Sequence, residues 1–160
     1  MQIEKATRGE KAREKLEQSW APEAAAAYWV NRSSRAILKL HEARLKPLGL
    51  QLAHLPVLIS LEEQGALSIG ELARIARVEA PSMVQLLARM ERDGLVQREE
   101  NPADKRSARI SLTRKARAKI PAAKAALNQG EKDATAPLSA RERETLIELL
   151  RKVAIALESQ

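Results

Sequence analysis

The chain of 160 residues contains no cysteine and no phenylalanine, and aromatic residues make up only 2% of it. Without cysteine, it can form neither a disulfide scaffold nor a zinc site with thiolate ligands. With so few aromatic rings, its core must be built from Leu, Ile, Val and Ala. No apolar run approaches the roughly 18 residues that a membrane-spanning helix needs. The first 20 residues mix Lys, Arg and Glu without an apolar centre, so we expect no signal peptide and a cytoplasmic location.

Positive charge is abundant, with a formal net charge of +7. The segment from Leu67 to Lys119 holds 12 Lys and Arg against 7 Asp and Glu, which places a net +5 in that segment. Cations that gather in one segment favour nucleic acid as a partner over a generally basic, solvated surface.

Two short helices separated by a tight break are predicted from Ser68 onward. Ser68 and Glu71 have the spacing of a capping box, in which each side chain satisfies a free backbone N–H group at the helix start. An apolar face follows at helical spacing: Ile69, Leu72, Ala73 and Ala76. After the break at 77–80, Pro81 suits the first position of the second helix. We also expect Pro81 to keep Ala80 out of helical geometry.

The second helix, predicted at about 81–93, has two faces of different character. Its inward face is apolar: Met83, Leu86, Leu87 and Met90. Another face carries hydrogen-bonding or cationic side chains: Ser82, Gln85, Arg89 and Arg92. Such side chains contact base edges and phosphates in the major groove of DNA. Asp93 and Gly94 should end the helix, because glycine readily takes the left-handed conformation.

A β-hairpin is predicted at about 95–112. Its second strand alternates apolar and polar residues, as a half-buried strand does: Ser107, Ala108, Arg109, Ile110, Ser111 and Leu112. The residues between the strands, Asn-Pro-Ala-Asp-Lys-Arg at 101–106, have turn chemistry and place Lys105 and Arg106 near the tip. A basic hairpin beside a helix-turn-helix is a wing, and an arginine there can enter a narrow minor groove.

The stretch from Ser68 to Ala118 resembles the winged helix-turn-helix of MarR-type transcriptional regulators. The resemblance rests on Met-Glu-Arg-Asp-Gly-Leu-Val at 90–96, the wing sequence at 101–106 and Ile-Ser-Leu-Thr at 110–113. Together, in this order and spacing, these motifs are specific. The flanking helices extend the resemblance to about Pro22–Leu157. It implies a mainly α fold with a small β-hairpin wing, an α+β winged helix-turn-helix, in a dimer built from the N- and C-terminal helices.

The resemblance implies a division into four parts. Residues 1–21 form an extension, 22–50 a dimerisation helix, 51–118 the DNA-binding domain and 119–160 the C-terminal dimerisation helices. The outer helices are longer than a compact winged domain needs, and a symmetric dimer would cover their apolar faces. Such a dimer would set two recognition helices about one DNA turn apart, roughly 10 bp, on a pseudo-palindromic operator.

Two helices are expected after the wing. Thr113 should cap the first, and the cations in its first turn oppose the helix dipole and are better explained if they face DNA phosphate: Arg114, Lys115 and Arg117. Pro121 should kink this helix. The Asn-Gln-Gly sequence at 128–130 and Pro137 bracket the interval in which we expect it to loosen or end. A second capping box, Ser139 with Glu142, opens the last helix. Its apolar face comprises Leu146, Leu149, Leu150, Val153 and Leu157.

The predicted DNA contacts are Arg77, Ser82, Val84, Gln85, Arg89, Lys105, Arg106 and Arg109. By resemblance, Asp104 would hold the wing arginine, and Arg106 would enter the minor groove. The chain departs from the family at two places in this region. Many relatives carry Thr-Arg where this chain has Val84-Gln85, so the operator preference cannot be carried over, and Ala116 stands where the family often has glycine.

Regulators of the MarR type often bind small aromatic or anionic molecules between the dimerisation helices and the winged domain. The candidates here are Tyr28, Trp29, Arg32, His41 and His54. The two aromatic rings offer a stacking surface, Arg32 a partner for a carboxylate, and His54 a hydrogen bond from an apolar wall. Each of them also has an ordinary interpretation as a core, interface or surface residue.

The leading hypothesis is a dimeric, sequence-specific DNA-binding regulator, typically a repressor released by a small ligand. The alternative is an architectural protein that coats AT-rich DNA without small-molecule control. No nucleophile–base pair, glycine-rich phosphate loop or metal-ligand spacing points to an enzyme. Two histidines are too few to argue a metal site, and no cofactor is expected.

Overall fold

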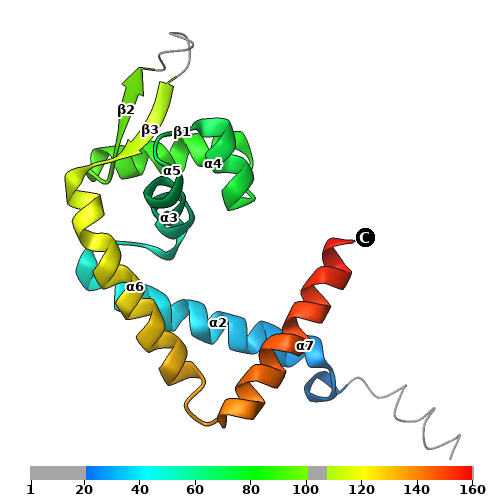
Figure 1. The fold of residues 1–160 in the computed structure, drawn as a ribbon. Coiled ribbons are helices and arrows are strands. Elements are labelled where there is room, and N and C mark those ends of the chain that lie inside the picture. Colours follow the sequence, from blue (N-terminus) through cyan, green and yellow to red (C-terminus); the bar gives the residue numbers. More distant parts are fainter. Residues whose placement is uncertain (1–20, 101–107, 160) are drawn as a thin grey trace, which may run out of the picture. The chain divides into compact units, whose positions relative to one another are not determined.

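The computed structural model describes residues 21–100 and 108–159 of the chain. It divides into two compact units, residues 1–36 and 37–160, which are described separately. Figure 1 shows the order of the helices and strands along the chain. Predominantly helical structure with one small antiparallel sheet confirms the predicted fold class.

The described part of the first unit begins with a short 3-10 helix, η1 (Pro22–Ala24), followed by the start of α2 (Ala26–Leu45). The prediction of one helix starting at Pro22 was therefore wrong by several residues. Ala25 takes an extended conformation, with φ −91° and ψ 127°, and separates the two helices.

The second unit contains the rest of α2 and all later elements. The short 3-10 helices η2 (Lys46–Leu48) and η3 (Leu52–His54) lead into α3 (Leu55–Gln64). The winged helix-turn-helix region, called the reading head below, consists of β1 (Leu67–Ser68), α4 (Ile69–Ala76), α5 (Ala80–Arg92), β2 (Val96–Glu100) and β3 (Ala108–Leu112). Two helices complete the chain, α6 (Arg114–Ala134) and α7 (Ala140–Glu158).

The sheet has three antiparallel strands in the order β1-β3-β2 (Figure 1). In the predicted hairpin, Val96 pairs with Leu112, and on the other side of β3 Leu67 pairs with Ile110. The hairpin prediction missed β1, because a strand of two residues is too short to show a period-2 pattern. Its second residue, Ser68, also serves as the N-cap of α4.

The core of the second unit is aliphatic, as the composition requires. It joins α3, α4, α5, the sheet and the first half of α6. Its largest fully buried side chains are Leu45, Leu58, Leu61, Leu72, Met83, Leu87, Met90, Leu95, Ile110 and Ile120. Burial on this scale contributes about 1.5–3 kcal/mol for each such side chain relative to exposure. The core thus holds the reading head against α6.

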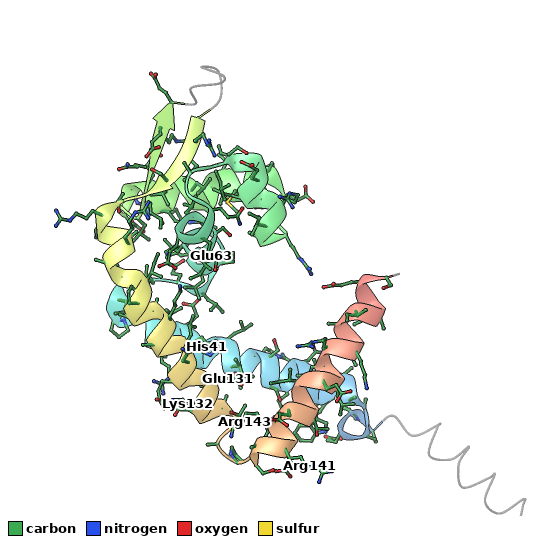
Figure 2. All side chains as sticks on the ribbon, viewed as in Figure 1. His41, Glu63, Glu131, Lys132, Arg141 and Arg143 are labelled. Atoms are coloured by element: carbon green, nitrogen blue, oxygen red, sulfur yellow. The ribbon has the colours of Figure 1, made fainter. Side chains whose placement is uncertain are left out.

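Helix α6 continues through residues 128–130 and ends at Ala134, which lies inside the interval 128–137 where its loosening or end was predicted. Glycine is required at position 130 because α2 crosses α6 closely at this point, which lies near His41 in Figure 2. A Cβ atom on Gly130 would lie 2.6 Å from Cδ2 and 2.9 Å from Nε2 of His41. Glycine is needed for close approach, and it does not break the helix.

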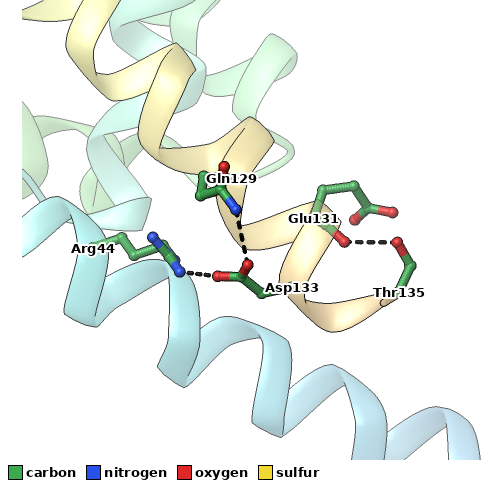
Figure 3. A network of polar contacts seen from close by, with 5 residues as sticks. All are labelled: Arg44, Gln129, Glu131, Asp133 and Thr135. Atoms are coloured by element: carbon green, nitrogen blue, oxygen red, sulfur yellow. Dashed lines mark hydrogen bonds and ion pairs between the residues drawn. The ribbon is translucent and has the colours of Figure 1, made fainter. Parts of the chain in front are cut away.

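Polar contacts continue the junction between α2 and α6 (Figure 3). Arg44 of α2 forms an ion pair with Asp133 of α6, and Gln129 donates a hydrogen bond to the same carboxylate over 2.9 Å. The Thr135 hydroxyl donates to the Glu131 carbonyl over 2.8 Å at the end of α6. The junction therefore combines the close approach of the His41 ring to Gly130 with the ion pair between Arg44 and Asp133.

Helix α7 begins at the predicted capping box and has no buried residue. Its exposed large apolar side chains are Leu146, Ile147, Leu149, Leu150, Val153, Ile155 and Leu157. Within the described ranges, no helix is both long enough and apolar enough to span a membrane.

Candidate nucleic-acid interface

Local hydrogen bonds define the start of the reading head. The Ser68 N–H donates to Oε2 of Glu71 over 2.7 Å, and the Glu71 N–H donates to the Ser68 hydroxyl over 3.2 Å, which confirms the predicted capping box. The hydrogen bonds from the backbone and hydroxyl of Ser68 lower the pKa of Glu71. The carboxylate therefore stays ionised at the helix N-terminus, where the helix dipole favours negative charge.

The turn between α4 and α5 is held by backbone geometry. Arg77 ends α4 in the left-handed conformation at φ 54°, and its N–H donates to the carbonyls of Ala73 and Arg74. Glu79, with ψ 148°, is the extended residue before α5, and Ala80 is already helical. The prediction that Ala80 stays outside the helix was thus wrong by one residue. Pro81 lies in the first turn of α5, where its missing N–H costs nothing.

The two faces predicted for α5 are present. Its inward side chains are at most 9% exposed: Met83, Leu86, Leu87 and Met90. The side chains predicted to contact DNA are exposed: Ser82, Val84, Gln85 and Arg89. Within the described part of the chain, Arg89 forms no ion pair. One face of α5 is thus buried in the core, and its other face presents hydrogen-bonding groups and the guanidinium group of Arg89.

The end of α5 is locked to the start of α6. Gly94 has φ 68°, and the Leu95 N–H closes the helix on the Met90 carbonyl over 2.8 Å. The Thr113 hydroxyl donates to the Gly94 carbonyl over 2.7 Å and accepts from the Ala116 N–H, so Thr113 caps α6 as predicted.

Lys115 has a role that the sequence did not indicate. Its ammonium group donates to the Asp93 carbonyl over 2.8 Å, at the C-terminal end of α5. A cation there interacts favourably with the negative end of the helix dipole. Lys115 was expected to face DNA phosphate together with Arg114 and Arg117. Arg114 and Arg117 are also exposed, and neither has a contact of this kind with the end of α5 among the described residues.

The wing strands are tied to the helices by side-chain contacts. The Arg98 guanidinium of β2 pairs with the Glu91 carboxylate of α5 over 3.1 Å. Glu99 accepts hydrogen bonds from the Ser111 hydroxyl and the Gln97 amide, which lower the pKa of its carboxyl. Ser111 is buried although the alternating pattern places it outward, and the hydrogen bond to Glu99 satisfies its hydroxyl group.

Two predicted DNA contacts have partners within the protein. Arg109 is half-buried and donates to the Ala66 carbonyl beside β1. Arg77 is exposed and pairs with the Glu158 carboxylate of α7. These contacts support structural roles, and the assignment of both arginines to DNA stays a prediction. The wing residues Asp104, Lys105 and Arg106 lie outside the described residues.

The predicted ligand-binding residues of the first unit form one cluster on α2. The rings of Tyr28 and Trp29 meet edge to face with centroids 5.2 Å apart. The Arg32 guanidinium donates to the Tyr28 hydroxyl over 3.0 Å and lies 5.9 Å from the centroid of the Trp29 ring. The Trp29 side chain is 50% exposed, and its N–H donates to the Glu23 carbonyl over 2.9 Å.

The two histidines of the second unit have separate surroundings. His41 lies against Gly130 in the α2–α6 junction, and its Nε2 atom is buried without a hydrogen-bond partner among the described residues. His54 is buried, and its Nδ1 atom accepts the Gln51 N–H over 3.2 Å. Burial lowers the pKa of His54, although the charges of Asp93 and Glu42 oppose this effect.

An open cleft of about 550 Å³ lies beside His54. It is lined by Lys39, Glu42, Ala43, Lys46, Gly49, Leu50, Gln51, His54 and Asp93. His54 is the only one of the five predicted ligand residues in this lining. Among the described residues, no group of three or more His, Cys, Asp or Glu side chains is arranged to hold a metal ion.

Comparison with known proteins gives consistent matches. A family model described as the MarR family matches residues 48–107. A mutant of MarR from Escherichia coli complexed with operator DNA is 27% identical at a TM-score of 0.72, over 79% of this chain and 91% of that one. The transcriptional repressor CouR, bound to a 23-mer DNA duplex, is 26% identical at a TM-score of 0.75, over 82% and 94% of the two chains.

A third similar structure contains a small molecule. It is the MarR family protein Rv2887 of Mycobacterium tuberculosis in complex with salicylic acid. It is 29% identical to this chain at a TM-score of 0.63, over 81% of this chain and 96% of that one.

Proposed function

Since the chain belongs to the MarR family of DNA-binding transcriptional regulators, we propose that it is a homodimeric repressor with a pseudo-palindromic operator and a small-molecule effector. The observation that carries the proposal is the outer face of α5. It exposes hydrogen-bonding and cationic side chains from a helix whose opposite face is buried. An exposed helix of this kind fits the major groove and can read base edges there.

In this proposal, Ser82, Val84, Gln85 and Arg89 contact bases or phosphates from α5. Lys105 and Arg106 contact DNA from the wing, and Asp104 orients the wing arginine. The exposed guanidinium groups of Arg114 and Arg117 at the start of α6 add phosphate contacts. Arg109 contributes mainly through its hydrogen bond beside β1, and Arg77 mainly through its ion pair with α7.

The dimer is supported by α7, which carries its apolar residues without burying one of them. Leu149, Val153 and Leu157 are 55%, 50% and 65% exposed, and they lie at i, i+4 and i+8 on one side of the helix. An exposed contiguous apolar face of this kind marks an interaction surface. A second copy of the chain covers it most economically, because a symmetric pair buries the same face on both protomers.

The effector proposed is a small aromatic or anionic molecule. The cleft beside His54 is lined by Lys39 and Lys46, whose ammonium groups suit an anion, and also by the carboxylates of Glu42 and Asp93. A separate candidate site, within the first unit, is the cluster of Tyr28, Trp29 and Arg32, which offers an aromatic surface and a cation. The salicylic acid bound to one of the similar structures is both aromatic and anionic.

DNA recognition is tested with a duplex chosen from a random pool and a scrambled control. Gln85→Ala and Arg89→Ala should weaken operator binding more than scrambled-DNA binding, since a lost base contact costs about 1–3 kcal/mol of discrimination. Lys105→Ala should weaken both and flatten the salt dependence by about one unit. If Gln85→Ala lowers the affinity for both duplexes equally, Gln85 does not contact a base.

Dimerisation is tested by sedimentation of Val153→Glu, which places a charge on the exposed apolar face. The variant should be monomeric and should bind operator DNA much more weakly, because each half-site is then bound alone. Arg151→Glu, on the same helix but outside the apolar face, is the matched control. Dimers of unchanged stability in the first variant would contradict the assignment of α7 to the interface.

A further inference from the structure

The exposed side of α5 carries an apolar stripe within its polar surface. We define this stripe as Pro81, Val84 and Ala88, which follow one another at i, i+3 and i+7 and are all exposed. Helical spacing puts these three residues on one side of the helix. Gln85 and Arg92 border the stripe, because each lies four residues after one of its members.

The core does not account for Val84. The buried face of α5 is complete without it, and the Val84 side chain is 43% exposed whereas Met83 and Leu87 are at most 1% exposed. Valine is also a poor choice for an exposed helix position, since its branched side chain loses rotamer freedom there. An exposed β-branched residue in the middle of a recognition helix therefore suggests a contact outside the chain.

The surroundings of the stripe favour DNA over a protein partner. Its three side chains are small and form a narrow row, which is much less apolar surface than a stable protein interface needs. The amide of Gln85 and the guanidinium groups of Arg89 and Arg92 complement base edges and phosphates. An apolar row between such groups matches one feature of the major groove, the methyl group that only thymine carries on its edge.

We propose that Val84 contacts the C5-methyl group of a thymine in each operator half-site and thereby selects a thymine at that position. Ala88, one turn later, has only a methyl side chain and lets the helix lie deep in the groove at this point. The inference rests on the proposed DNA-binding function, and it assigns the contact of one side chain within it. Gln85 then reads a neighbouring base by hydrogen bonds, so the two adjacent residues use different chemistry.

The contact should have a measurable and specific size. Deoxyuridine differs from thymidine only by the missing methyl group, so its hydrogen-bonding groups are unchanged. Burial of one methyl group corresponds to about a fourfold change in affinity. Replacement of the contacted thymine by deoxyuridine in one half-site should therefore weaken binding about fourfold, and replacement in both half-sites should weaken it more than tenfold.

The experiment replaces each thymine of the selected operator by deoxyuridine, one position at a time, and measures the affinity of the full-length protein. Wild type should show the fourfold loss at one position per half-site. Val84→Ala should bind the thymine operator more weakly and lose the distinction between thymine and deoxyuridine at that position. Gln85→Ala is the matched control, because it should bind more weakly yet keep the deoxyuridine effect.

Several results would overturn the inference. A specific operator that tolerates deoxyuridine at every position would refute the methyl contact while leaving the proposed DNA-binding function intact. A deoxyuridine effect of equal size in wild type and Val84→Ala would assign the contact to another residue. Failure to select any specific duplex would overturn the proposed function, and the assignment of Val84 would fall with it.

Discussion

Replacement of Gly130 by alanine should destabilise the protein, although alanine is the better helix former. The added Cβ atom would lie 2.6 Å from Cδ2 and 2.9 Å from Nε2 of His41, well inside van der Waals contact, and 3.4 Å from Cδ of Arg44. Overpacking of this kind costs about 1–3 kcal/mol. The gain in helix propensity offsets about 1 kcal/mol of that cost. We therefore expect the free energy of unfolding to fall by about 1 kcal/mol.

Gly70 provides the matched control. It also lies in a helix, but a Cβ atom there would have nothing within 4 Å. Gly70→Ala should therefore raise the free energy of unfolding by up to about 1 kcal/mol. In a His41→Ala background the obstructing ring is absent, and Gly130→Ala should become stabilising as well. Additivity would fail for this pair because the two residues are in contact.

The assay is urea unfolding followed by circular dichroism, at one fixed protomer concentration because dimerisation would add to the apparent stability. The wild type, the three single variants and the double variant are compared by their midpoints at equal slope. Stabilisation by Gly130→Ala equal to that by Gly70→Ala would refute the close approach of α2 and α6. So would a loss that persists unchanged without the His41 ring.

Three further predictions concern individual contacts. Burial lowers the pKa of His54 and so favours its neutral form in the folded state. The free energy of unfolding should therefore be highest above about pH 6.5 and should fall as the pH drops through the lowered pKa. In His54→Gln, the urea midpoint should depend less on pH over that range. Ser68→Ala should lower the free energy of unfolding by about 1 kcal/mol, because it removes the capping box of α4. If this variant loses more free energy of operator binding than of unfolding, a purely structural role of Ser68 is contradicted. Lys115→Ala should lower the free energy of unfolding by about 0.3–1 kcal/mol but leave the salt dependence of DNA binding unchanged. Arg117→Ala, in contrast, should flatten the salt dependence by about one unit. The same flattening in both variants would indicate that Lys115 contacts DNA.

Local chemistry made much of this fold predictable. The capping box at Ser68, the cap at Thr113 and the break before Pro81 each depend on residues within a few positions of one another. The two faces of α5 follow from helical period alone, because one side of that helix is covered and the other is not. These features also contain most of the candidate DNA surface, which explains how the sequence could indicate it.

Contacts between distant segments could not be predicted from the sequence. Gly130 was interpreted only as part of the signal for the end of α6, yet the partner that requires glycine there is His41, on another helix. Lys115 was assigned to DNA, since only the folded chain brings it to the Asp93 carbonyl. Arg109 likewise has a backbone partner, Ala66, that lies 43 residues earlier. Contacts of this kind are set by tertiary packing, which leaves no local pattern in the sequence.

Selection from a random duplex pool shows whether a dimer of this protein reads a specific duplex with α5 and the wing. The affinity of the purified protein for the winning sequence and for a scrambled duplex is then measured across salt concentrations. We expect the selected sequence to be pseudo-palindromic, with half-sites roughly 10 bp apart, and to be bound at least about a thousandfold more tightly than the scrambled duplex. An unstructured pool with equal affinities for both duplexes would contradict it and would favour an architectural protein that coats AT-rich DNA.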